Sequence, residues 1–219
     1  MSTAADSRKQ ILERIRAATA GDPAHSPKGG EKGAPTASGY IRRGVMSAPA
    51  RLELMAERLR EYDAVVVECP PEALAGTIHE HLKASGRRTF VVPAGLPAEW
   101  LASEVVWRID GDLPVDDIET ADGVITACFC AVAESGAIVL HHGPAEGRRV
   151  ISLLPDWHLC VVYGSQVVET LPEYFDRCEN PPRLVTWIAG PSATADIEMT
   201  RIKGVHGPRF LNVILVRDQ

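Results

Sequence analysis

The sequence lacks the features that mark several large classes of protein. Its 219 residues carry 23 basic and 29 acidic side chains, and the adjacent basic pairs are isolated, so no basic stripe for nucleic acid is present. The longest nearly apolar run, 124–140, is interrupted at Glu134 and does not read as a membrane span. The first twenty residues are too charged for the apolar core of a signal peptide. We therefore expect a soluble, cytoplasmic protein that binds no nucleic acid and has no membrane span.

Cofactor signatures are also missing. The sequence has no Walker pattern, no G-x-G-x-x-G fingerprint and no run of cysteines spaced to hold an iron–sulfur cluster. Of its five cysteines, only Cys128 and Cys130 lie close together, and zinc sites normally leave two or more residues between paired cysteines. An odd number of cysteines in a cytoplasmic chain favours free thiols. The sequence thus predicts no metal and no cofactor in this chain.

Glycine and proline, by contrast, are abundant in one segment. Ten of the 34 glycines and prolines lie between residues 21 and 50. Before this segment, apolar residues at three-to-four spacing predict an amphipathic helix over 7–19. We therefore predict an N-terminal helix and flexible linker over residues 1–47 and an α/β domain over 48–219. The helix either packs on its own domain or on a dimer mate, or it docks on a different protein.

The rest of the chain alternates between helical and extended patterns. Short apolar strands separated by helices indicate a parallel sheet with both faces covered. Up to residue 109, helices are expected at 49–61, 71–84 and 97–101 and strands at 64–67, 89–92 and 105–109. The next strands, at 123–127, 137–140, 150–153 and 159–163, are joined by segments too short for crossover helices and are expected to meet antiparallel or to wrap locally. A helix at 171–178, a strand at 183–188, a helix begun by Pro191 and Ser192, and a strand at 210–216 complete an α/β domain with a mixed sheet.

Glu134 is the first candidate site residue. It is a carboxylate within an apolar stretch, where an unpaired buried charge would be costly, and Ser135 and Gly136 follow it with turn chemistry. A carboxylate at the end of a strand beside a glycine turn is well placed to act as a nucleophile or a base. The alternative is that Glu134 caps a local turn.

Two further candidates lie near the C-terminus. Gly190, Ser192 and Thr194 follow an expected strand, where backbone N–H groups and hydroxyls can bind an anion. Ser192 is equally well explained as a helix N-cap. The tripeptide His-Gly-Pro occurs twice, and in its second copy His206 and Gly207 offer a base or an anion contact near neutral pH, or simply a turn.

Four short motifs carry a resemblance to a known family. AESG, SLLP, GPSATADIE and GVHGP occur in that order within 48–216, and this combination resembles the lactate utilization protein C family, whose body is the LUD domain. The resemblance implies a three-layer mixed sheet like the ribose-phosphate isomerase, glucosamine-phosphate deaminase and CoA-transferase-like fold. It also implies a part in oxidising L-lactate to pyruvate, together with partner proteins that carry iron–sulfur clusters.

We therefore expect an accessory component of an iron–sulfur lactate-utilisation system. It would bind a small carboxylate, a phosphate-containing ligand or a partner subunit near Glu134, Ser192 and His206, which should then line one pocket, and it can form a homodimer. An alternative is a free-standing enzyme resembling CoA transferases or sugar-phosphate isomerases, with Glu134 as nucleophile or base. A third is a regulatory module that binds a ligand without consuming it.

Overall fold

The computed structural model describes residues 4–19, 41–101, 104–194, 202–203 and 206–218. The chain divides into two units, Met1–Tyr40 and Ile41–Gln219. The first contains α1 (Ala4–Thr19), the helix expected from the spacing of Ile11, Leu12 and Ile15. No helix in the described part of the chain combines the length and the apolar character needed to cross a membrane.

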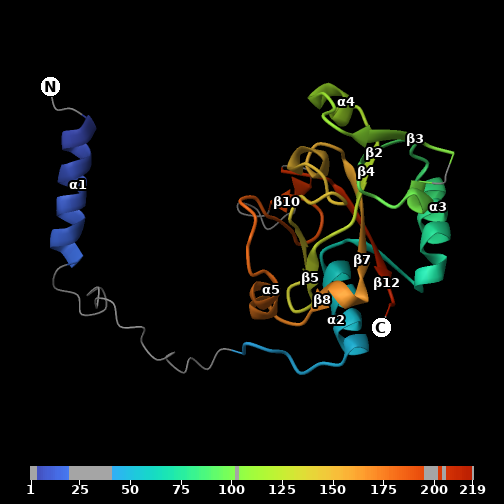
Figure 1. The fold of residues 1–219 in the computed structure, drawn as a ribbon, viewed down its shortest axis with the longest axis horizontal. Coiled ribbons are helices and arrows are strands. Elements are labelled where there is room, and N and C mark those ends of the chain that lie inside the picture. The colour runs from blue at the N-terminus through green and yellow to red at the C-terminus, as the bar shows by residue number, and fades with distance from the viewer. Residues whose placement is uncertain (1–3, 20–40, 102–103, 195–201, 204–205, 219) are drawn as a thin grey trace. The chain divides into compact units, whose positions relative to one another are not determined.

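The second unit is built on a six-stranded sheet (Figure 1). Its strand order is β1-β12-β7-β4-β2-β3, and every pairing described in it is parallel. The interior strands are mostly apolar because both faces of the sheet are covered. The six strands are β1 (Val65–Cys69), β2 (Thr89–Pro93), β3 (Val106–Asp110), β4 (Gly123–Thr126), β7 (Trp157–Tyr163) and β12 (Phe210–Val216).

Two further layers cover this sheet, one on each face (Figure 1). On one side α3 (Leu74–Ser85) buries Leu74, Ile78 and Leu82. On the other side α2 (Ala48–Glu61) packs its apolar stripe together with a second sheet of order β8-β5-β6-β9. The strands of that second sheet are β5 (Cys130–Val132), β6 (Ala137–Leu140), β8 (Val167–Val168) and β9 (Thr186–Ile188). The unit is therefore a three-layer α/β domain with a mostly parallel central sheet.

Short elements connect these layers. They are the 3₁₀ helices η2 (Pro71–Ala73), η3 (Ala98–Leu101), η4 (Arg149–Ser152) and η5 (Gly164–Gln166), the helices α4 (Val115–Glu119) and α5 (Leu171–Arg177), and the strand pair β10 (Ala193–Thr194) and β11 (Ile202–Lys203).

The strand expected at 150–153 is wrong, because η4 occupies that segment. Ile151 is fully buried in a small cluster with Val91 and Val124. Burying one side chain of a short apolar run does not require an extended backbone, and periodicity alone cannot distinguish a short strand from one helical turn.

The antiparallel arrangement expected after residue 121 holds only for β6, which pairs with β9 and with β5, a strand not predicted from the sequence. β4 and β7 lie side by side and parallel in the central sheet. No α-helix makes this crossover, although the 3₁₀ helix η4 lies within it. The β5–β6 hairpin and the loop after it leave the central sheet, form part of the covering layer and return the chain to the start of β7.

The helix expected to begin at Pro191 and Ser192 is also wrong at its start. Residues 190–192 form a bend that leads into β10, and residues 195–201 lie outside the described residues. The backbone N–H of Ser192 donates to the carbonyl of Pro208, and its hydroxyl accepts the N–H of His206. Ser192 therefore ties two loops together and does not cap a helix.

Candidate functional site

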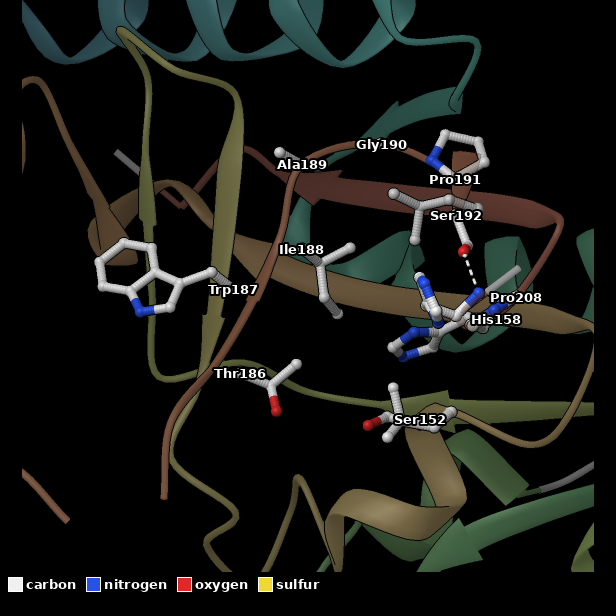
Figure 2. Close-up of a pocket in the computed structure, with 14 residues that line it drawn as sticks. Ser152, His158, Thr186, Trp187, Ile188, Ala189, Gly190, Pro191, Ser192 and Pro208 are labelled. Atoms are coloured by element: carbon white, nitrogen blue, oxygen red, sulfur yellow. Dashed lines mark hydrogen bonds between the residues drawn. The ribbon is translucent and has the colours of Figure 1, made fainter. Parts of the chain in front are cut away.

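A cavity of about 260 Å³ lies where the start of β7 and the start of β12 meet β9 and the loop that follows it (Figure 2). We call it the Ser192 cavity. Its volume lies just below the range of about 300–1,000 Å³ that is typical of ligand pockets, so it suits a small molecule. It is lined by Ser152, Leu153, His158, Thr186, Trp187, Ile188, Ala189, Gly190, Pro191, Ser192, His206, Gly207, Pro208 and Leu211.

The loop after β9 holds its shape through one glycine and two hydrogen bonds. Gly190 has a φ of +79°, and a Cβ there would lie 2.4 Å from Cβ of Tyr62, so no other residue fits without a shift of the backbone. Ser192 Oγ accepts the N–H of His206 at 2.9 Å, drawn as the dashed line in Figure 2, and the Ser192 N–H donates to Pro208 O at 2.9 Å. Because the Ser192 oxygen is the acceptor in this bond, its own hydrogen is free to donate to a ligand.

His158 forms part of the inner wall. Its side chain is buried at the start of β7, and Nε2 hydrogen-bonds with the hydroxyl of Thr126 at 2.8 Å. Burial lowers the pKa of His158 from 6.5 to about 4, because the charged imidazolium is poorly solvated there. His158 is therefore neutral at physiological pH and offers a ligand hydrogen bonding without charge.

Thr186 connects the cavity to a second histidine. Its hydroxyl lies 2.8 Å from Nε2 of His142, and Nδ1 of the same ring lies 3.0 Å from the carbonyl of Gly147. A carbonyl can only accept, so Nδ1 carries the hydrogen, and in the neutral ring Nε2 accepts the Thr186 hydroxyl. These two bonds fix both the tautomer and the orientation of the His142 ring.

Four of the residues singled out in the sequence meet in this cavity. Gly190 and Ser192 come from one loop, and His206 and Gly207 come from another. Ser192 and His206 are fourteen residues apart in the chain. Thr194 lies in β10, and its side chain is outside the described part of the molecule.

The other three predicted residues lie elsewhere. Glu134 and Ser135 are exposed on the turn between β5 and β6, and neither they nor Gly136 line the Ser192 cavity. Gly136 has a φ of +65°, and a Cβ there would lie 2.7 Å from Cβ of Arg58 on α2. The turn therefore packs closely against α2, and the glycine is required by that contact.

Sequence reasoning missed three polar residues of the cavity wall, namely Ser152, His158 and Thr186. His158 lies in a continuous apolar strand, and the other two lie in short apolar segments. The hydrogen bond between Thr186 and His142 joins residues 44 apart in the chain. No local motif announces such a contact.

The chemistry of the cavity is that of hydrogen bonding beside apolar surface. Three hydroxyl-bearing residues, Ser152, Thr186 and Ser192, line it together with the apolar side chains of Ile188 and Leu211. None of the described lining residues is a lysine or arginine. No three metal-ligating side chains are grouped anywhere in the described ranges. The arrangement can hold a small molecule that has both polar oxygens and an apolar group.

Comparisons with known proteins point to one family. The family model of the LUD domain matches residues 115–216. Lactate utilization protein C of Deinococcus radiodurans is 40% identical over 164 residues, which is 73% of this chain and 76% of that protein. Lactate utilization protein C of Geobacillus thermodenitrificans is 29% identical over 204 residues, covering 83% of this chain and 82% of that protein.

A solved structure agrees with this assignment. The crystal structure of a DUF162 family protein from Deinococcus radiodurans is similar with a TM-score of 0.66 and 34% sequence identity, covering 78% of this chain and 99% of that chain. Both the sequence relatives and the structural neighbour cover most of the three-layer unit. The chain belongs to the lactate utilization protein C family.

Proposed function

We propose that this protein is an accessory component of a lactate-utilisation system and that it binds a small hydroxy- or oxo-carboxylate in the Ser192 cavity. Two findings support the proposal: relatives named for lactate utilisation, and a cavity of about 260 Å³ that is too small for a large cofactor. Because the oxidation of lactate requires an electron acceptor, we place that acceptor on iron–sulfur partner proteins, as the family resemblance implies.

The pairing of Ser192 with the His206 backbone is the observation that carries the ligand site. The Ser192 oxygen accepts in this bond, so its own hydrogen remains a donor, and His206 also lines the cavity. The Ser192 hydroxyl suits the carboxylate of the ligand, and Ile188 and Leu211 suit its methyl group. The neutral His158 is compatible with a ligand hydroxyl or carbonyl oxygen.

Binding of L-lactate and pyruvate to the purified full chain tests the site. We expect Ser192→Ala to weaken binding by about tenfold, because a hydrogen bond to a charged group is worth about 1.5–3 kcal/mol. Ser135→Ala is the matched control, since it removes an exposed serine hydroxyl from the β5–β6 turn. Equal loss of affinity in both variants, or no binding of either compound, contradicts the site.

Turnover assays test the accessory role separately. The isolated chain should leave L-lactate unchanged, and conversion to pyruvate should appear only when iron–sulfur partners are added. Pyruvate formed by the isolated, metal-free chain would contradict this role. An enzyme that uses Glu134 is not favoured, because the Glu134 side chain is exposed on a turn and does not line the Ser192 cavity.

A further inference from the structure

A second and larger cavity, of about 610 Å³, opens at the carboxyl ends of β2 and β3. Pro93 is the last residue of β2 and Asp110 the last residue of β3, and both line it. The opposite wall is the loop 142–149, which ends at the start of η4. We call this the Arg149 cavity.

This cavity lies beside the point where the strand order of the sheet reverses, on the side of β2 and β3. β2 and β4 are neighbours, but the chain leaves β2 toward β3 on one side and leaves β4 toward β7 on the other. In open α/β sheets, ligands bind outside the carboxyl ends of the strands at such a reversal of strand order. The loop spans this point, because Gly95 N–H donates to Pro144 O at 3.0 Å and Ala127 N–H donates to Ala145 O at 2.9 Å.

The loop itself is held in a strained and well-supported conformation. His142 has a φ of +59°, in the left-handed region that residues with side chains rarely occupy. The buried carboxylate of Glu146 accepts hydrogen bonds from the backbone N–H groups of His141 and His142. The His142 ring is hydrogen-bonded to the Gly147 carbonyl and the Thr186 hydroxyl. Backbone strain of this kind persists only where the surroundings enforce it, and it concentrates at ligand sites.

The charges that line the cavity do not cancel. Arg148 makes a bidentate pair with the buried carboxylate of Asp110, with Nη2–Oδ1 2.6 Å and Nε–Oδ2 3.0 Å. This pair lowers the pKa of Asp110, chiefly through the hydrogen bond from Arg148, so the carboxylate stays ionised. Arg149 is exposed and makes no ion pair with any residue that the structure describes. Arg148 also pairs with the exposed carboxylate of Asp112, with Nη1–Oδ1 3.4 Å, so Arg149 is the lining cation that no described carboxylate pairs with.

We propose that the Arg149 cavity binds an anionic organic molecule whose carboxylate or phosphate group pairs with Arg149. A guanidinium group recognises either anion through two parallel N–H donors. Pro93, Pro144 and Leu184 supply apolar contact for the remainder of the ligand. The Ser192 cavity has no such cation among its described lining residues, so only the Arg149 cavity offers its ligand a guanidinium group. This inference does not depend on the proposed function.

NMR titration of the full chain with inorganic phosphate, and separately with pyruvate, tests the proposal. We expect at least one probe to shift the amide resonances of Ala94, Gly143 and Gly147. Arg149→Ala should raise the dissociation constant by about tenfold or more. Arg88→Ala is the matched control. Arg88 is an exposed arginine directly before β2, at the amino end of that strand, whereas the cavity lies at the carboxyl end.

Each outcome decides a point. Shifts with phosphate alone identify a phosphate-bearing ligand, and shifts with pyruvate alone identify a carboxylate. Arg149→Lys, which keeps the charge but loses the planar fork, should retain part of the affinity, and Ser192→Ala should leave binding here unchanged. If neither probe shifts these resonances, or if Arg149→Ala binds as tightly as Arg88→Ala, the cavity is not an anion site.

Discussion

Replacing His158 with glutamine should remove a specific part of the acid sensitivity of this protein. In the folded chain the pKa of His158 is about 4, and without burial it is 6.5. As the pH falls, the His158 ring of the unfolded chain takes up a proton before the ring of the folded chain does. The free energy of unfolding is therefore unaffected by the titration of this residue above pH 6.5 and decreases as the pH falls from 6.5 toward 4. Each unit of pKa difference corresponds to about 1.36 kcal/mol, so the total decrease in the free energy of unfolding is about 3 kcal/mol. About 2 kcal/mol of this is already lost at pH 5.

Urea unfolding at pH 7.5 and pH 5 measures this quantity. The free energy of unfolding should fall by about 2 kcal/mol more in the native sequence than in His158→Gln. Glutamine can still hydrogen-bond with Thr126, and every other titrating group is shared by the two proteins. An equal fall in both proteins, or an NMR titration in which the His158 ring takes up its proton near pH 6.5, would refute the reasoning.

Three further substitutions test the supports of the two cavities. Gly190→Ala should lower the free energy of unfolding by at least about 1 kcal/mol in urea, because the residue is left-handed and its Cβ would meet Tyr62; an unchanged midpoint contradicts this. Arg148→Ala should lower the free energy of unfolding by about 2 kcal/mol in the same assay, because it leaves the buried, ionised Asp110 without its guanidinium partner. The loss should be larger at neutral than at acid pH, and a loss that does not depend on pH contradicts this. Glu146→Ala should speed hydrogen exchange of the His141 and His142 amides, because it removes the oxygen that accepts both N–H groups, and full protection in the variant would show that the carboxylate does not hold them.

The elements that could be predicted from the sequence are those with strong local patterns. The strand at 210–216 matches β12 in full, because a mostly apolar run with several β-branched residues suits a strand that is covered on both faces. The apolar stripe of α2 is likewise set by its own spacing, with Leu52, Met55 and Leu59 buried. In these segments local preference and tertiary packing agree.

The failures occur where contacts between distant segments decide the conformation. Serine is a residue type preferred at helix N-caps, but the Ser192 hydroxyl accepts the N–H of His206 from a distant loop. Glu134 was singled out for its apolar neighbours, yet the turn exposes its side chain while Gly136 packs on Arg58. Only the assembled layers decide which side of such a turn faces solvent, and no local pattern carries that information.

One hydrogen bond joins the walls of the two cavities. His142 lines the Arg149 cavity, Thr186 lines the Ser192 cavity, and their side chains meet at 2.8 Å. A ligand that shifts either side chain therefore alters the free energy of the other site. Thermodynamic linkage makes the effect reciprocal, so each ligand changes the affinity of the other by the same factor. Measuring one dissociation constant at saturating concentrations of the second ligand would give that coupling directly.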